Sequence, residues 1–173
     1  MTLQSKFPLT AQDILILKEL QKDGRRSFTD IARVVNVAIA TVRKRVNQMI
    51  ENGVLQIMAR VNPYKVGFNA YANIFIKVQP PDLVNAVAAR IAEFPEISWI
   101  AMTTGDYDLT VDVMCRDNDH LTHLITERLS AIEGVAATRT EMVLKVYKVW
   151  QADFDLLLED NASQPATADR RRL

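Results

Sequence analysis

The sequence predicts an α+β protein made of two domains, and three observations lead to this fold class. Residues 1–62 carry apolar residues at the three- and four-residue spacing of short amphipathic helices. Over residues 71–150, stretches that alternate apolar and polar residues, as strands do, flank two helical stretches. Between the two patterns, residues 63–70 are rich in turn-forming residues. We therefore expect a helical N-terminal domain over 1–62, a hinge over 63–70, an α/β domain over 71–150 and a tail over 151–173.

Length and composition limit what the chain can be. Its 173 residues, 49% of them hydrophobic, suffice for two small domains that each bury a core. No apolar run approaches the length of a membrane span, and the first ten residues lack the apolar core of a signal peptide. We expect a cytoplasmic protein with no membrane partner. Cys115, the single cysteine, lies in an apolar strand-like run, so we expect a buried, inert thiol rather than a nucleophile or metal ligand.

The formal net charge of zero hides an asymmetry between the two domains. Residues 1–62 hold ten Lys and Arg against five Asp and Glu, whereas the remainder holds eleven against sixteen. A basic N-terminal domain on an acidic body favours contact of the first part with a polyanion. A charged face that is merely solvated gives the same balance, so the placement of the charges has to decide.

The first helix is expected to begin at Thr10, because Thr10 and Asp13 have the spacing of a capping box. It is expected to end near Gly24, since glycine is common just after a helix. The apolar stripe of this helix is predicted to consist of Ile14, Leu15, Leu17 and Leu20.

Residues 27–53 contain the most informative pattern of the chain. Ser27, with Asp30 three residues later, starts a second helix, and Asn36 suits the left-handed conformation of a tight turn before a third. The residues expected in the core are Ile31, Val34 and Val35 from the second helix and Val42, Val46, Met49 and Ile50 from the third. Two short helices joined by a tight turn, the second one basic on its outer face, are typical of a helix-turn-helix. A strand pair over 54–61 is expected to form its wing.

The C-terminal domain has the element order βαββαβ of a ferredoxin-like motif. The expected elements are strand 71–78, helix 81–94, strand 97–103, strand 107–115, helix 117–132 and a long strand 135–149. In the tail, a short amphipathic turn is expected over 154–158 and disorder over 161–173.

These segments together resemble the Lrp/AsnC (feast/famine) family of bacterial and archaeal transcription regulators, from Leu9 to about Lys148. The motifs that carry the resemblance are LTAQDILILKELQKDGRRSFTDIA, TVRKRVNQMIENGVL, VNPYKVG, TTGDYDLTVDV and GVAATRTEMVL. The resemblance implies a winged helix-turn-helix that binds double-stranded DNA and a ferredoxin-like domain that dimerises, assembles into octamers and binds amino acids. Ala38 stands where the family pattern places a Ser that caps the recognition helix, and an Ala there costs about 1 kcal/mol of helix-end stability.

The expected DNA contacts come mainly from the third helix. Arg and Lys neutralise phosphates, and Arg, Asn and Gln can also pair with base edges. The residues assigned to this site are Arg25, Arg26, Ile39, Ala40, Thr41, Arg43, Lys44, Arg45, Asn47 and Gln48. For Arg45, an internal salt bridge that holds the helices together is an equally good interpretation.

Gly105–Asp108 is the second candidate site, although its residue types alone indicate a hairpin turn. The resemblance implies that this loop lines an effector pocket between neighbouring dimers. The residues assigned to the pocket are Thr104, Gly105, Asp106, Tyr107, Asp108, Thr138 and Thr140. Asp106 or Asp108 would accept from an α-ammonium group, and backbone N–H groups near Gly105 would take the carboxylate. Thr138 and Thr140 are equally well explained as plain strand residues.

The sequence leaves two other classes of function open. Sirohaem decarboxylases share a similar two-domain plan, but an enzyme of that type needs basic and imidazole groups around a tetrapyrrole. Here there are two histidines, His120 and His123, and no further ligands complete a metal site around them. An effector-binding module with a vestigial DNA domain is favoured by Ala38 and opposed by the basic third helix. We therefore expect a regulator without a metal or cofactor, not an enzyme, with an amino acid as its effector.

Overall fold

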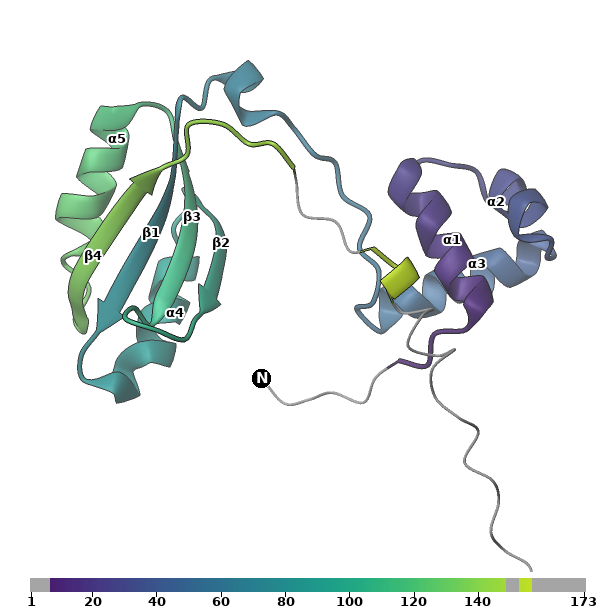
Figure 1. Cartoon of the computed structure of the whole chain (residues 1–173), viewed down its shortest axis with the longest axis horizontal. Helices are drawn as coiled ribbons and strands as arrows, with labels where there is room; N and C mark the ends of the chain where they lie inside the picture. The colour runs from purple at the N-terminus through teal and green to yellow at the C-terminus, as the bar shows by residue number, and fades with distance from the viewer. Residues whose placement is uncertain (1–6, 149–152, 157–173) are drawn as a thin grey trace, which may run out of the picture. The chain divides into compact units, whose positions relative to one another are not determined.

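The computed structural model describes residues 7–148 and 153–156, and the chain divides into two compact units. The N-terminal unit comprises residues 1–59 and 150–173, and the C-terminal unit comprises residues 60–149. The first unit is helical, whereas the second is built on a four-stranded sheet (Figure 1). No helix within the described ranges is long and apolar enough to cross a membrane.

Helix α1 (Ala11–Lys22) begins with the predicted capping box. Thr10 Oγ1 accepts a hydrogen bond from the Asp13 N–H at 3.2 Å, and Asp13 Oδ2 accepts one from the Thr10 N–H at 2.7 Å. The predicted stripe was wrong at Leu15, which is 44% exposed, because the core face of the helix is formed instead by Ile16, Leu17 and Leu20.

Helices α2 (Phe28–Val35) and α3 (Ile39–Glu51) form the predicted helix-turn-helix. Asn36 joins them in the left-handed conformation, with φ 57° and ψ 52°, as the sequence predicts. Val34 and Ile50 were expected in the core, but they are 55% and 45% exposed. The core faces are narrower than predicted and consist of Ile31, Ala32, Val35, Val42, Val46 and Met49.

The predicted strand pair over 54–61 is not present, since the chain runs through these residues without a strand. The N–H groups of Val54 and Leu55 both donate to the carbonyl of Met49 and extend the end of α3 instead. Leu55 packs on the helical core, but Val54, Ile57 and Met58 are exposed. A two-stranded hairpin is only marginally stable without a covering partner, which explains the missing wing.

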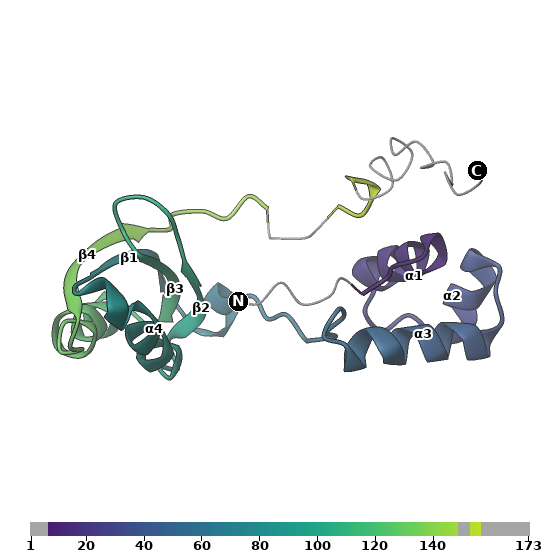
Figure 2. The ribbon, with the colours of Figure 1, turned by 90° about the horizontal axis from the view of Figure 1, so that it is seen from below.

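The C-terminal unit has the predicted ferredoxin-like topology, with antiparallel neighbours in the order β2-β3-β1-β4. A 3₁₀ turn, η1 (Pro63–Val66), precedes the sheet. The strands are β1 (Ala70–Val78), β2 (Ile97–Met102), β3 (Leu109–Cys115) and β4 (Val135–Met142). The helical elements are η2 (Pro81–Leu83), α4 (Val84–Ala92), α5 (Asn118–His123) and η3 (Leu124–Leu129), and they lie on one face of the sheet (Figure 2).

The helix expected over 81–94 is a 3₁₀ turn followed by an α-helix that ends at Ala92, and the strand expected over 107–115 begins at Leu109. Two other predicted elements of this unit differ more from the structure. The helix expected over 117–132 continues after His123 as a π-helix, η3, rather than as an α-helix. The last strand ends at Met142, short of the expected 149, and residues 143–148 form no strand. In the tail, Asp155 and Leu156 are helical as expected, whereas the remainder of the predicted turn and the segment 161–173 lie outside the described residues.

Alternating side chains of the two central strands form the core of the C-terminal unit. Ile74 and Ile76 of β1 and Val111 and Val113 of β3 are fully buried under the helices. The intervening residues, including Phe75, are half-buried and form the open face of the sheet. The sheet therefore presents one closed and one open face, as the sequence alternation predicts.

Candidate functional site

The outer face of α3 carries most of the residues assigned to DNA. Those that are exposed are Ile39, Ala40, Thr41, Arg43, Lys44 and Asn47, whereas Gln48 is half-buried. Within residues 7–148 and 153–156, the side chains of Arg43 and Lys44 make no hydrogen bond or ion pair. These two cations are therefore available to an external anion.

Arg45, on the flank of the same helix, is bound inside the unit. Its Nε donates to Asp13 Oδ1 at 2.6 Å, its Nη2 donates to Asp13 Oδ2, and its Nη1 donates to Gln48 Oε1 at 3.2 Å. The guanidinium also lies over the Phe7 ring, 5.4 Å from the centroid. The internal salt bridge that the sequence left open is thus present, and it ties α3 to the start of α1.

The Asp13 carboxyl is completely buried, so its charge depends on its partners. Burial alone would raise the pKa of Asp13, but hydrogen bonds from Arg45 and Thr10 outweigh it and hold this pKa below its ordinary value. The pair is therefore ionised at neutral pH and fixes the position of α3.

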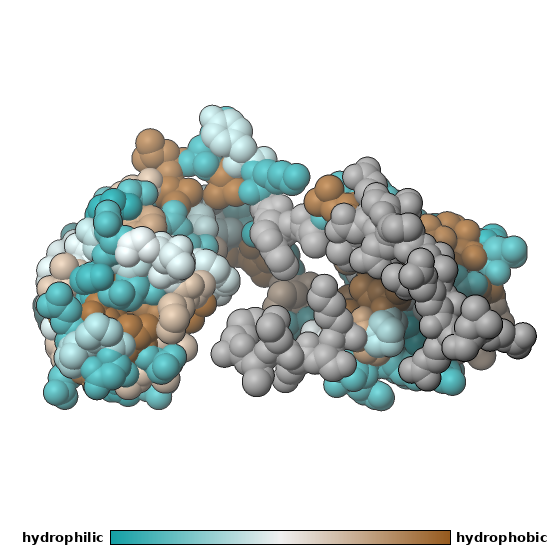
Figure 3. Space-filling view, turned by 60° about the horizontal axis from the view of Figure 1, so that its bottom comes forward, coloured by the Kyte–Doolittle hydropathy of each residue, from teal (hydrophilic) through white to brown (hydrophobic). Residues whose placement is uncertain are grey.

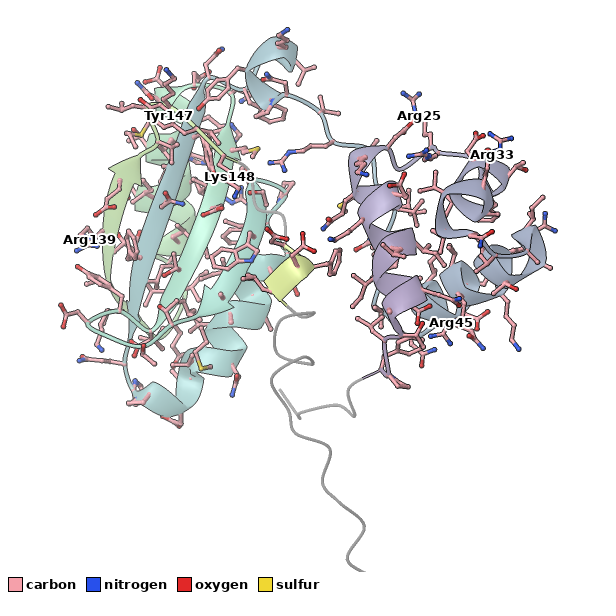
Figure 4. The ribbon with its side chains drawn as sticks, turned by 45° about the vertical axis from the view of Figure 1, so that its right-hand side comes forward. Arg25, Arg33, Arg45, Arg139, Tyr147 and Lys148 are labelled. Atoms are coloured by element: carbon pink, nitrogen blue, oxygen red, sulfur yellow. The ribbon has the colours of Figure 1, made fainter. Side chains whose placement is uncertain are left out.

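The two arginines before α2 also differ from each other, because one is bound inside the unit and the other is exposed. Arg26 is ion-paired with Glu19, which is only 6% exposed and is also bound by Lys22 Nζ at 2.6 Å. Arg25 is exposed, and its guanidinium has no ion pair in the described part of the chain. Figure 4 shows Arg25 projecting outward, as does Arg33 on α2, an exposed arginine not assigned to the site from the sequence.

The start of α3 lacks a side-chain cap. Ala38 occupies the N-cap with φ −66° and ψ 144°, the same angles as the Ser27 N-cap of α2. Ser27 Oγ accepts from the Asp30 N–H at 3.1 Å, but Ala38 has no atom that can do so. The backbone at residue 38 is therefore already arranged for a capping hydroxyl.

The loop between β2 and β3 holds the main effector candidates. Thr104, Gly105 and Asp106 are exposed, and Gly105 has φ +119°, a conformation that favours glycine. Asp108 is already used by the fold, because its Oδ2 accepts from the Val78 N–H at 2.8 Å and lies 3.3 Å from Lys77 Nζ. The hydrogen bond from the Val78 backbone is the main reason why the pKa of Asp108 is lowered.

Tyr107 belongs to a cluster on the open face of the sheet that the sequence did not predict. Its ring centroid lies 6.0 Å from that of Phe75, and the Arg139 guanidinium carbon lies 4.4 Å from the Phe75 centroid and 5.2 Å from the Tyr107 centroid. Arg139 is the direct register partner of Phe75. Their shared face follows from strand pairing, which a single sequence does not specify.

Thr138 and Thr140 do share one face of β4, but it is the face opposite to this cluster. They pair with Ile76 and Ile74, whose side chains point into the core beneath the helices. Directly paired residues of antiparallel strands lie on the same side of a sheet. The structure therefore separates the two threonines from Tyr107.

The remaining reactive residue types are engaged in the fold. Cys115 is buried, and burial raises the pKa of its thiol to about 11, as expected of an unreactive cysteine. His120 Nε2 lies 3.0 Å from Glu96 Oε1, whereas His123 Nδ1 lies 3.1 Å from Glu127 Oε2, so the two histidines contact different carboxylates. Among the described residues, no group of three or more potential ligands could hold a metal ion.

Two protein-family models match the chain in the places where these features lie. A model described as winged helix-turn-helix DNA-binding matches residues 9–56, and a model of the Lrp/AsnC ligand binding domain matches residues 69–151. The chain belongs to the Lrp/AsnC family of transcriptional regulators.

Relatives of similar length support this membership. An uncharacterized HTH-type transcriptional regulator of Pyrococcus horikoshii is 35% identical over 144 residues, which are 83% of this chain and 90% of the relative. The HTH-type transcriptional regulator FL11 of Pyrococcus furiosus is 36% identical over 137 residues, 79% of this chain and 89% of the relative.

Solved structures share the fold. AsnC of E. coli has a TM-score of 0.78 at 24% identity, covering 84% of this chain and 99% of that one. A transcriptional regulator of Neisseria meningitidis, solved as a complex with L-Met, has a TM-score of 0.79 at 24% identity, covering 87% and 99%.

Proposed function

We propose that this regulator binds double-stranded DNA through the exposed face of α3, with Arg25 on the flanking backbone, and that an amino acid changes its assembly or its DNA affinity. The proposal of DNA binding rests on the difference between the basic side chains that are bound inside the unit and those that are exposed. Arg26 and Arg45 neutralise buried carboxylates, whereas Arg43, Lys44 and Arg25 remain exposed and available. On this proposal, residues 1–62 bind DNA, residues 71–150 bind the effector, and the protein acts in the cytoplasm.

The test of DNA binding is the double variant Arg43→Ala with Lys44→Ala. Each phosphate contact contributes about 0.9 to the slope of log affinity against log salt. The variant should therefore bind DNA more weakly, and the magnitude of its slope should fall by about 1 to 2. Fluorescence anisotropy with DNA fragments selected from the genome, at several salt concentrations, measures the affinity and its salt dependence. Arg90→Ala, an exposed arginine of the C-terminal unit, is the matched control. Equal affinity of the double variant and the control would contradict the assignment.

The effector proposal rests on the exposed loop at Gly105 and on solved relatives by fold, of which the Neisseria meningitidis regulator was obtained with L-Met. The Asp106 carboxylate is the preferred partner for an α-ammonium group, because Asp108 already binds the β1 backbone. Asp106→Asn keeps the backbone unchanged and should weaken amino-acid binding about tenfold, as expected for loss of a charged hydrogen bond. Calorimetric titration of the wild type and the variant with L-methionine and the other amino acids measures this change in affinity. Full affinity in Asp106→Asn would place the effector elsewhere.

We also propose that the protein is a dimer or a larger assembly of copies of itself. The open face of the sheet carries Phe75 and Met114 half-buried and Trp99 50% exposed, and such apolar surface favours burial by a second copy. Figure 3 shows hydrophobic side chains, in brown, among polar ones at the surface. Light scattering at micromolar concentration should give at least twice the mass of the 173-residue chain. A monomer would contradict this proposal.

A further inference from the structure

A short segment near the C-terminus packs against the helix-turn-helix unit. Phe154 is half-buried and contacts the apolar core formed by α1, α2 and α3. The neighbouring Asp155 accepts an ion-paired hydrogen bond from Lys18 Nζ on α1. Phe154 and Asp155 themselves lie outside the two family matches, which cover residues 9–56 and 69–151.

Helix α1 is buried on more than its core face. Ile16, Leu17 and Leu20 join the core with α2 and α3, but Ile14 is also only 3% exposed and does not belong to that cluster. Ile14 and Lys18 are four residues apart and therefore lie on the same side of the helix, one turn from each other. The ammonium end of Lys18 is where Asp155 binds. This second side of α1 therefore carries a buried apolar side chain and, one turn away, the ammonium group that binds Asp155.

We propose that residues 153–156 form a docking segment that seats on α1 of its own chain, with Phe154 as the apolar anchor and Asp155 as the ion-pair partner of Lys18. The chemistry is complementary, since an aromatic side chain meets the apolar core and a carboxylate meets an ammonium. The consequence is that the DNA-binding unit is joined to the sheet by two chain connections. One runs before β1, and the other runs from the end of β4 to Phe154.

The docked segment leaves the proposed DNA-binding face open. Its contacts are with Lys18 and the apolar core, and α1 lies between the segment and α3 in Figure 2. The exposed side chains of Arg43 and Lys44 on α3 are not among its contacts. The segment therefore acts as a second anchor of the unit rather than as an inhibitor that covers it.

Carbodiimide crosslinking tests the contact in the unmodified full-length protein. The reagent activates the Asp155 carboxylate, and the Lys18 amine displaces a urea to form an amide bond, which requires direct contact of the two groups. We expect mass spectrometry to find the linked peptides in the band of monomer size on a denaturing gel, and Asp155→Asn to abolish the link. Linked peptides confined to the dimer-sized band would mean that the segment docks on another copy. That result, like the absence of the link, would overturn the proposal.

Hydrogen exchange of α1 tests whether the docked segment protects the helix. Phe154→Ala should speed exchange in the peptide spanning residues 11–22 by about fivefold, because a partly buried aromatic contact is lost. Leu156→Ala is the matched control, since Leu156 lies in the same turn but is 65% exposed, and it should leave exchange unchanged. Unchanged exchange in Phe154→Ala would refute the anchor.

A charge reversal provides an independent check of the ion pair. Asp155→Lys should speed exchange of α1, and adding Lys18→Glu to the same chain should restore it. Failure of the double variant to restore protection would overturn the pairing. Neither measurement involves DNA or an amino acid, so a negative result here leaves the proposed regulatory function untouched.

Discussion

Each of the two units contains a buried carboxylate that holds a helix in place, Asp13 in the N-terminal unit and Glu96 in the C-terminal unit, but the hydrogen bonds to these two carboxylates differ. In the N-terminal unit, both oxygens of Asp13 are bound, by Arg45 of α3 and by Thr10. In the C-terminal unit, Glu96 gives a single oxygen, Oε1, to both His120 and Arg128, at 3.0 and 2.6 Å. Its Oε2 is buried and has no partner among the described residues.

The difference shows where each unit tolerates change. Asp13 is completely buried, so the loss of Arg45 would leave a full charge without compensation. The partners of Glu96 are 20% and 32% exposed, so they can be hydrated when the carboxylate is removed. The helix that is proposed to read DNA is thus fastened more rigidly than the helix that covers the sheet.

The largest effect is expected for Arg45→Met. It leaves the buried Asp13 carboxylate without its counter-charge and should lower the free energy of unfolding by about 3 kcal/mol. Arg43→Met on the exposed face of the same helix is the control, and it should change stability by less than about 0.5 kcal/mol. Urea-induced unfolding measures both. Similar losses in the two variants would remove the distinction between the bound and the available arginine.

A smaller loss is expected in the C-terminal unit. Glu96→Ala should cost about 2 kcal/mol, since it removes two hydrogen bonds but frees partners that water can reach. Glu93→Ala, which removes an exposed carboxylate paired with Arg90, should cost less than about 0.5 kcal/mol. Thermal unfolding compares the two variants with the wild type. A loss for Glu96→Ala larger than that for Arg45→Met would reverse the order of the two units.

Acid pH should reduce the stability that the Asp13 carboxylate gives to the folded protein. The pKa of Asp13 in the folded protein is lowered from its ordinary value of 3.8. The stability that the ionised carboxylate contributes is therefore complete above pH 3.8 and is lost as the pH falls through the pKa of the folded state. The stability difference between wild type and Asp13→Asn should therefore be constant from about pH 8 to about pH 5 and shrink below pH 3.8. Urea unfolding at several pH values follows it. A difference that grows towards acid would contradict the ionised pair.

The smallest effect is a gain at the N-terminus of α3. Ala38→Ser should add about 1 kcal/mol of stability, because residue 38 already has the backbone angles of the capped Ser27 and its hydroxyl can accept from the Thr41 N–H. The reciprocal loss is expected for Ser27→Ala, which serves as the reference. No gain in Ala38→Ser would mean that this end of α3 is set by something other than its cap.

The elements that a local pattern determines were predictable from the sequence. Thr10 and Ser27 cap helices as expected, and the alternation in β1 and β3 identified the buried face of the sheet. The left-handed turn at Asn36 also followed from its residue type. In each case the decisive interaction lies within a few residues of sequence.

The features that depend on distant partners were not predictable. Arg45 meets Asp13 across 32 residues of sequence, so the sequence left its role open. Thr138 and Thr140 were grouped with the loop at Gly105, but the pairing of β4 with β1 turns them to the other face. The contact of Phe154 with the helical core is longer in range still, and the amphipathic turn expected over 154–158 did not identify the surface that it would meet.

The π-helical turn η3 has a consequence for how the sequence can change in length. A π-helical turn holds more residues than an α-helical one, and here Leu124 and Leu129, five apart, both face the core. An extra residue in an α-helix would rotate everything after it by about 100°, and η3 absorbs such a residue within one turn. Residues 124–129 are therefore the place where this helix accommodates an insertion, and where a homologue shorter by one residue would restore a regular α-helix.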